Sequence, residues 1–484
     1  MLVACAAIWG MFHQRPFDYI DQTRLDMIGL FRVTYGFMIV LRLLLVRPAA
    51  PMVLGWRQTS HVLRCIYLWM IPAVMMMVGF LTPLAILAHI LFGSIIWRRS
   101  KVYSLEDVLI RSAGFCLLFL NSHLSFSVDQ WLGLDFGLSI PSLVGLNFYC
   151  WTFGILMLSA GWEKLCSPMW RRGLGFFYFM SLRHWVKPSF HWANKSRAAS
   201  VVMSWATIAT QFFLVLALLV PAVRWVSFPM SLGFAISLCL MVYLAFLSTQ
   251  TLLSSTFLFV IEFSPYFKGG PEFALPSGPI GTQAPLLWIA CFFLLLAVIS
   301  CSGLVKLRGG LITTLSAWTI ALRPIMIFVE THIYGIYIFR QVAKLPGGDK
   351  AVLENWDING IPCGLQAWHP RTIAGTTYRV TDYCIAVNEN VLDRAADRAE
   401  SIVDLGYAAF LELSPSERKE VTEIDFQVRV FNPEETFVSD TSHWLSAPWQ
   451  SIGVIKGFPD HPHFVPGGKP PAYRKTLRWP VTFQ

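Results

Sequence analysis

Long apolar runs separated by short polar loops fill the first two thirds of this chain. A helix needs about 20 apolar residues to cross the hydrocarbon core of a bilayer. By this pattern we predict about eight or nine membrane spans. They are Ile28–Val46, Cys65–Gly79, Pro83–Trp97, Leu109–Phe126, Leu143–Leu158, Val201–Val220, Pro229–Leu253, Pro285–Leu304 and Leu311–Ile338. A short Gly-Phe-Leu-Thr-Pro segment joins the second span to the third and predicts a tight helical hairpin.

Composition supports a membrane protein. Hydrophobic residues make up 55% of the chain and charged residues only 14%, whereas a soluble domain carries roughly a quarter charged residues. We therefore expect a mainly α, polytopic transmembrane helical bundle embedded in a lipid bilayer. The stretch Met1–Phe12 is an apolar lead-in without room for the basic region and apolar core of a cleavable signal.

The sequence changes character near residue 340. We assign residues 1–340 to the membrane domain and residues 341–484 to a small extramembrane α+β domain, because no apolar run after 340 approaches span length.

Local patterns in this tail predict its elements. Thr376–Val387 alternates and is rich in β-branched and aromatic residues, which favours a strand. Asn390–Leu405 has helical periodicity. A short helix follows from Pro415, then a second strand over Val421–Val430, while the proline- and glycine-rich Gly457–Pro471 predicts irregular structure.

The net charge of +9 comes largely from lysines and arginines in loops beside the spans. In that position they reflect membrane topology and lipid headgroups, and no interleaved aromatic and basic pattern of a nucleic-acid module occurs. We exclude nucleic acid as a partner. Counted by the positive-inside rule, the Arg98–Lys101 and Lys164–Arg197 loops would be cytoplasmic.

Metal and thiol chemistry find little support. No Cys-x-x-Cys pair occurs, and His461-Pro-His463 brings too few ligands for a metal site. We expect no metal. Cys363 and Cys384 could form a disulfide if the tail lies outside the cytoplasm.

Lys164 stands where a long apolar helix ends, and two interpretations of it compete. It can be an interfacial anchor whose amine reaches the headgroups, with Trp162, Glu163 and Trp170 as parts of the same belt. It can instead be a base: burial disfavours the charged amine, and a neutral amine takes a proton from a phenol-like substrate. Spacing alone favours the anchor.

Other charged residues lie at membrane depth. Arg32 and Arg42 are ten positions apart on the first span and share a helix face, which predicts one buried pairing partner and one interfacial anchor. Glu106 and Asp107 open the fourth span, where acids complement the helix dipole, and Asp107 has the spacing to pair with Arg111.

Five stretches of the chain resemble the vitamin K-dependent gamma-glutamyl carboxylase family and the related bacterial HTTM membrane domains. The stretches are Arg15–Asp18 with Leu30–Val40, Phe126–Asp129, Ala160–Leu165 with Trp170 and Gly173, Arg183–Trp185 with Pro188 and Phe190, and Tyr243–Gln250 with Ser264–Phe267. Their order and spacing agree over roughly Arg15–Phe267, a little over half of the chain.

This resemblance implies that Lys164 deprotonates reduced vitamin K or menaquinol. Oxygen then yields a strong base that activates a glutamate for CO2 addition, and the quinone leaves as an epoxide, so O2 and CO2 are co-substrates and a peptide or protein is the acceptor. The residues expected around the substrate or quinone pocket are Trp162, Glu163, Arg183, His184, Trp185, Arg32, Glu106 and Gln250.

Two departures separate the chain from the true carboxylases. A family histidine near the start of the fourth span corresponds here to Leu105–Glu106, and a second corresponds to Ala245. The resemblance therefore supports deprotonation of a quinol better than carboxylation. It also places Lys164 and the tail on the periplasmic side of a bacterial inner membrane, against the charge count.

Three hypotheses follow. The first is an integral-membrane enzyme that uses a reduced quinone at Lys164. The second is a non-catalytic membrane factor that helps to mature or export a partner protein. The third, a transporter, is disfavoured because the sequence has no inverted repeats or matched broken helices.

Overall fold

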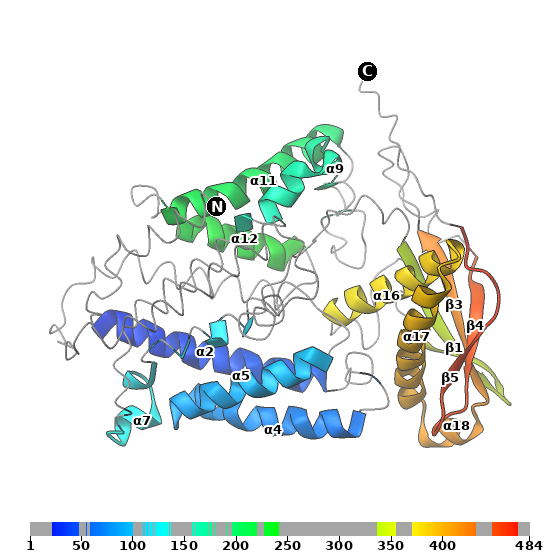
Figure 1. Cartoon of the computed structure of the whole chain (residues 1–484), viewed down its shortest axis with the longest axis horizontal. Coiled ribbons are helices and arrows are strands. Elements are labelled where there is room, and N and C mark those ends of the chain that lie inside the picture. The colour runs from blue at the N-terminus through cyan, green and yellow to red at the C-terminus, as the bar shows by residue number, and fades with distance from the viewer. Residues whose placement is uncertain are drawn as a thin grey trace.

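The computed structural model describes residues 22–47, 55, 59–99, 110–111, 113–115, 117–118, 120, 122–134, 136, 157–158, 160–173, 175–176, 180, 190, 196–219, 227–241, 336–354, 370–431 and 448–472. These residues are mostly helical, and a small antiparallel sheet lies in the C-terminal region (Figure 1).

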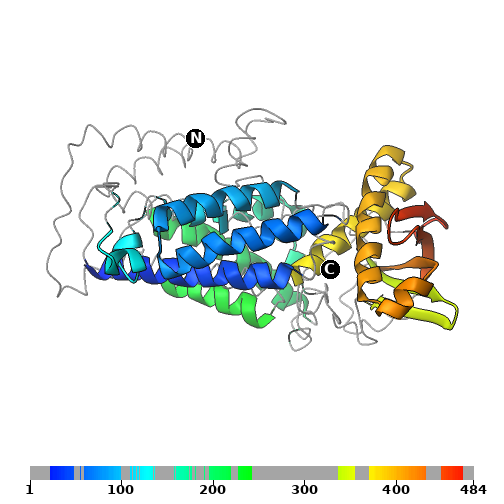
Figure 2. The same cartoon turned by 90° about the horizontal axis from the view of Figure 1, so that it is seen from below.

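Among the described residues, five long helices form from the apolar runs. They are α2 (Gln22–Val46), α4 (Thr59–Val78), α5 (Thr82–Arg99), α11 (Arg197–Leu219) and α12 (Ser227–Met241). Helix α4 packs against both α2 and α5, as Figure 2 shows, and α11 packs on α12. Helices are confirmed at the first, second, third and sixth predicted spans, although α2 and α4 begin about six residues before the predicted start. Helix α12 lies at the start of the seventh predicted span, and most of the other predicted spans lie outside the described residues.

Two of the described helices are long and apolar enough to cross a membrane, through the segments Leu25–Leu44 of α2 and Arg197–Leu216 of α11. The apolar stretches of α4 and α5 are shorter, at Leu63–Val78 and Thr82–Ile96.

The predicted hairpin between α4 and α5 is confirmed. Gly79 ends α4 with a φ of 73°, a conformation that favours glycine. The N–H groups of Gly79 and Phe80 both donate to the carbonyl of Met75 at 2.9 Å. This C-terminal cap turns the chain directly into α5.

The fourth predicted span, Leu109–Phe126, is wrong in its second half. Its described residues are helical from Ile110 to Leu117, but Ser122–Leu124 form the 3-10 helix η2, and the short helix α7 (Val128–Trp131) follows. The carbonyls of this stretch point to the side chain of Arg32 instead of continuing a helix. Hydropathy alone does not reveal that a distant arginine needs these carbonyls as hydrogen-bond acceptors.

The described part of the tail forms a five-stranded antiparallel sheet in the order β2-β1-β3-β4-β5. Its strands are β1 (Ile336–Leu345), β2 (Gly348–Glu354), β3 (Glu423–Phe431), β4 (Gln450–Lys456) and β5 (His463–Pro466). Helices α16 (Pro370–Asn388) and α17 (Leu392–Glu412) cover one face, and α18 (Pro415–Glu420) leads into β3 (Figure 1). Phe339 and Phe426 stack on the covered face with ring centroids 5.3 Å apart.

Three predictions for the tail need correction. Thr376–Val387 belongs to helix α16 and is not a strand. Its residues Val380, Tyr383 and Cys384 are buried at helical spacing against α17 and β1, so packing overrides the local β propensity. Strand β5 lies inside the predicted irregular segment, and β1 begins before residue 341, at the end of the predicted ninth span. The predicted helices at α17 and α18 and the predicted strand at β3 are confirmed.

Cys384 is buried on α16 with a free thiol. Burial raises the pKa of that thiol well above its usual value. The predicted partner, Cys363, lies outside the described residues, and the disulfide is not formed at Cys384.

Candidate functional site

Lys164 lies on a helical segment that ends at Cys166, followed by α9 (Pro168–Arg171). Ala160, Gly161, Lys164 and Ser167 are buried on this segment, and their spacing of three or four residues places them on one helix face. The segment therefore presents its single lysine toward the protein interior.

Helix α11 covers that face. A Cβ atom on Gly161 would lie 3.2 Å from Cβ of Gln211 and 3.3 Å from the ring of Phe212. Glycine at this position allows the two helices to approach closely, and it brings Gln211 against the turn that precedes Lys164.

The same two elements are joined again beyond α9. The hydroxyl of Ser200 donates to the carbonyl of Gly173 at 2.6 Å, and the N–H of Phe176 donates to the hydroxyl of Ser204 at 3.1 Å. Gly173 has a φ of 78°, and a Cβ there would lie 2.4 Å from the Val201 side chain. Contacts on both sides of Lys164 thus fix its helix to α11.

The amine of Lys164 is withdrawn from water. Only 4% of the residue is exposed, and Nζ donates to the carbonyl of Ala160 at 3.2 Å. Nζ also lies 5.3 Å from the ring centroid of Trp170, which Gly175 accommodates because a Cβ there would lie 2.3 Å from that ring. Among the described residues no carboxylate forms an ion pair with this amine. An interfacial anchor would have its amine in solvent.

Three buried oxygen atoms near this segment lack a hydrogen-bond partner among the described residues. They are Oε2 of Glu163, Oγ of Ser167 and Oε1 of Gln211. Buried polar atoms are almost always paired, and each exception calls for an explanation such as an absent ligand or water. The amine of Lys164 and these oxygens are the candidate site.

Of the other residues predicted for the site, the structure describes only some. Trp162 is 57% exposed and Glu163 is half-buried. The remaining predicted residues other than Arg32 lie outside the described residues, namely Arg183, His184, Trp185, Glu106 and Gln250.

Arg32 belongs to a different structure from the one we predicted for it. It is fully buried, and all five N–H groups of its guanidinium donate hydrogen bonds to backbone carbonyls. The acceptors are Ser122 at 3.1 Å, Met76 at 2.6 Å, Met77 at 3.2 Å, Ser125 at 3.1 Å and Phe126 at 2.6 Å. No donor remains for a quinone, so Arg32 joins α2 to the end of α4 and to the loop before α7.

Asp129 completes this junction. Its carboxylate accepts from the N–H groups of Leu81 and Thr82 at 2.7 and 2.8 Å, and from the Thr82 hydroxyl at 2.6 Å. It thereby caps the first turn of α5 from a distant part of the chain. Arg42 is buried as well, so the expectation that one of the two arginines is an interfacial anchor is wrong.

A buried cluster around His89 was not predicted from the sequence. The indole N–H of Trp69 donates to Nδ1 of His89 at 2.9 Å, so Nε2 carries the proton and donates to the Tyr35 hydroxyl at 2.9 Å. That hydroxyl donates to the carbonyl of Ile110 at 2.6 Å. Every polar atom is paired, which gives this cluster a structural role. The one sequence signal was a histidine inside an apolar helix, which is more often packed than functional.

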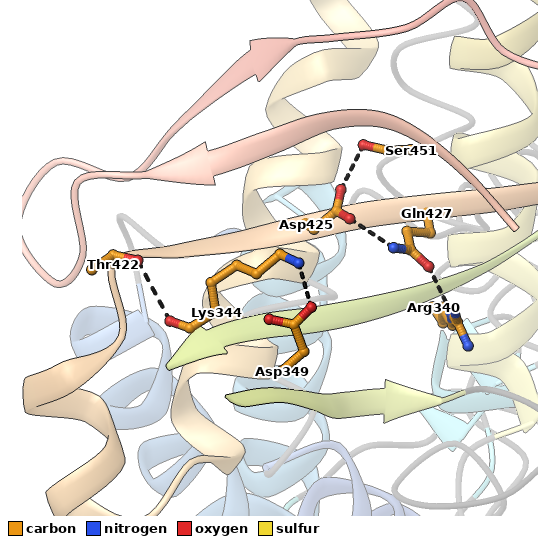
Figure 3. Close-up of polar contacts among 7 residues, drawn as sticks. All are labelled: Arg340, Lys344, Asp349, Thr422, Asp425, Gln427 and Ser451. Atoms are coloured by element: carbon orange, nitrogen blue, oxygen red, sulfur yellow. Dashed lines mark hydrogen bonds and ion pairs between the residues drawn. The ribbon is translucent and has the colours of Figure 1, made fainter. Parts of the chain in front are cut away.

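The outer face of the tail sheet also carries a polar network (Figure 3). Arg340 donates to Gln427 at 2.7 Å, and Gln427 and Ser451 donate to the two oxygens of Asp425 at 2.7 and 2.6 Å. Lys344 pairs with Asp349 beside them. These side chains satisfy one another. Within the described residues no group of His, Cys, Asp or Glu side chains is arranged to hold a metal ion.

Comparison with known proteins yields no match to a protein-family model, a curated protein or a solved structure.

Proposed function

We propose that the chain is a multi-pass protein of a bacterial inner membrane that uses Lys164 to remove a proton from a reduced quinone, either vitamin K hydroquinone or menaquinol. One observation carries the proposal: the Lys164 amine is buried and makes its described contacts with a carbonyl and an aromatic ring. The resemblance of Ala160–Leu165 to the carboxylase lysine motif is the second support.

The surroundings of Lys164 suit a base. Burial disfavours an ammonium ion, and a neutral amine accepts a proton from a phenolic hydroxyl within hydrogen-bond reach. The unpartnered oxygens of Glu163, Ser167 and Gln211 match a ligand that brings hydroxyl groups. Removing the hydroxyl proton raises the electron density of the ring, which prepares it for O2.

When bound, the quinol would supply all the electrons that reduce O2, one pair as the ring becomes a quinone and a second pair as its double bond becomes the epoxide. One oxygen atom then ends in the epoxide and the other, with the two hydroxyl hydrogens, in water. The role of the chain is limited to what its residues do. Lys164 accepts the proton, the Trp170 ring shields the amine on one side, and α11 fixes the lysine helix through Ser200 and Ser204.

Carboxylation of a peptide is the weaker part of the proposal, because the two family histidines are replaced at Leu105–Glu106 and Ala245. We therefore expect epoxide formation to exceed the incorporation of labelled CO2 into any glutamate peptide. A role as a non-catalytic maturation or export factor remains the alternative.

The proposal is tested with the full chain purified in detergent and supplied with menaquinol and oxygen. Epoxide is measured by chromatography, and an anaerobic sample is the control. We expect the epoxide to form only with oxygen, and Arg171→Met, which changes an exposed cation on α9, to react like the wild type. Absence of epoxide from the wild type contradicts the proposal and favours the maturation or export role.

The periplasmic location that we propose for the tail is tested separately. Lys419 is exposed on α18, so a Lys419→Cys variant offers a reactive thiol on the tail, unlike the buried native Cys384. We expect a membrane-impermeant maleimide to label this variant in cells with a permeabilised outer membrane, beyond the labelling of the wild type. Labelling only after the inner membrane is broken would place the tail in the cytoplasm.

A further inference from the structure

A firmly held loop closes one end of the bundle of α2, α4 and α5. The loop contains η2 and α7 and contacts α2 and the start of α5 (Figure 1). Arg32 binds the carbonyls of Ser125 and Phe126, and the N–H of Asp129 donates to the carbonyl of Gly79 at 2.9 Å. Hydrogen bonds therefore fix the backbone of this loop to the turn between α4 and α5.

Large apolar side chains nevertheless point outward from this end of the bundle. Five of them are exposed, and together we call them the loop face: Phe80, Phe126, Trp131, Leu132 and Leu134. Trp131 is 83% exposed and Phe126 is 60% exposed. Residues 79–97 and 122–134 contain a single Asp, Glu, Lys or Arg, the buried Asp129. Exposed apolar groups gathered in this way mark contact with a partner or a membrane.

The backbone of this region is strained where it presents these side chains. Leu81 has a φ of 45° and Phe126 a φ of 49°, a left-handed conformation that is uncommon for bulky residues. The hydrogen bonds from Arg32 and to Asp129 hold both residues in place. Such strain is retained where it serves a function, because a loop in water would tolerate glycine at position 126 and a polar residue at position 131.

The sides of α4 and α5 lead to the loop face with exposed apolar stripes. The stripe of α5 consists of Leu84, Leu87, Leu91 and Ile95, and that of α4 of Leu68, Ile71, Val74 and Val78. Their spacing of three or four residues places each stripe on one face of its helix. Apolar stripes that run the length of a helix suit contact with acyl chains.

The length of α2 places the loop face at a boundary of the bilayer. The apolar segment Leu25–Leu44 has 20 residues, which rise by about 30 Å, the thickness of the hydrocarbon core. At its start, the Asp26 carboxylate accepts from the Ser125 hydroxyl at 2.6 Å. Beyond its end, the exposed Arg47 lies 5.5 Å from the ring centroid of Tyr67. The loop and the arginine thus mark opposite edges of the core.

We infer that the loop face enters the boundary between the headgroups and the acyl chains of the bilayer, so that its partner is the lipid surface itself. Aromatic residues, tryptophan above all, favour this boundary because it offers an apolar layer beside a hydrated one. A backbone that is already fixed loses little freedom when its side chains bind. The inference rests on the membrane location in the proposed function and is independent of the reaction at Lys164.

Photocrosslinking tests the contact. The full chain is prepared in liposomes of phosphatidylethanolamine and phosphatidylglycerol, with benzoylphenylalanine replacing one residue at a time. After irradiation, mass spectrometry detects attached phospholipid. The replaced residues are Phe126 and Trp131 of the loop face, Leu91 on the α5 stripe as the acyl-chain reference, and Leu392 at the start of α17 as the matched control. Leu392 is an exposed leucine of the tail, and the unfolding temperature of each variant confirms that it is folded.

We expect phospholipid adducts at positions 126, 131 and 91 and none at position 392. Adducts at position 91 but not at 126 and 131 would overturn the inference and leave the membrane location standing, as would crosslinks from 126 and 131 to a second copy of the chain. Equal adduct yields at 392 would overturn it as well, because the contact would not be specific to the loop face. Lipid adducts at none of the four positions would overturn both the inference and the membrane location.

Discussion

Arg32 and Lys164 are both basic side chains buried among apolar helices, yet their surroundings differ completely. Arg32 has a backbone carbonyl for every N–H that it carries. Lys164 has one carbonyl at 3.2 Å and the face of a tryptophan, with unpartnered oxygens beside it. A buried basic group with a complete set of hydrogen-bond partners holds a fold together, whereas one with few partners is available for chemistry.

The comparison predicts opposite costs for removing each basic group. In Arg32→Met five carbonyls and the nearby Asp129 lose their donor or counter-charge, and we expect the free energy of unfolding to fall by about 3–5 kcal/mol. Thermal unfolding in detergent measures this loss of stability. Arg32→Lys should recover only a part of the lost free energy of unfolding, because an ammonium lacks the planar fork of five donors. An Arg32→Met protein as stable as the wild type would contradict the structural role.

A second variant tests the Lys164 side of the comparison. Gly173→Ala adds a Cβ at a φ of 78° and 2.4 Å from the Val201 side chain. We expect a loss of about 1–3 kcal/mol of stability and a displaced Lys164 helix. Increased hydrogen exchange over residues 160–173 would show the displacement, and Gly133→Ala, at a glycine of φ 64° with open space around it, controls for backbone strain alone.

The smallest effect on stability is expected for an ion pair at the protein surface. On the tail, the hydrogen bond from Lys350 at 2.6 Å, together with those from the Ser414 backbone and side chain, lowers the pKa of Glu417 to about 2. Because this folded-state pKa lies below the ordinary value of 4.5, the contribution is complete above about pH 4.5 and is lost as the pH falls toward 2.

Hydrogen exchange of the α18 peptide, corrected for the intrinsic rate, measures this pH dependence. Protection should decline between about pH 4.5 and 2 in the wild type, and Glu417→Gln should show a flatter profile. Equal slopes in the two proteins would mean that Glu417 does not contribute.

The sequence predicted those parts of the fold that depend on local pattern. Apolar runs marked α2, α4, α5 and α11, and the glycine after α4 marked the hairpin turn. Helix α16 was mistaken for a strand, because its β-branched and aromatic residues satisfy both a period of two and the helical spacing of Val380, Tyr383 and Cys384. Only the covering α17 and β1 decide between them.

The candidate site was predictable to a similar extent. Lys164 could be named from its place at the end of an apolar run. The role of Arg32 could not, since its acceptors come from Met76 and from the loop around Ser125, far away in the sequence. Gln211 was missed for the same reason. A single amide in an apolar helix was the available signal, and its meaning depends on Gly161 of another helix.

The central claim is that Lys164 serves chemistry and not the fold, and the most direct test is the rate of menaquinol epoxidation per folded molecule in Lys164→Met. Methionine keeps the apolar stem and removes the amine. We predict a rate at least about 100-fold below the wild type, with an unfolding temperature close to that of the wild type. A Lys164→Met protein that forms epoxide as fast as the wild type, or that unfolds as readily as Arg32→Met, would contradict the account.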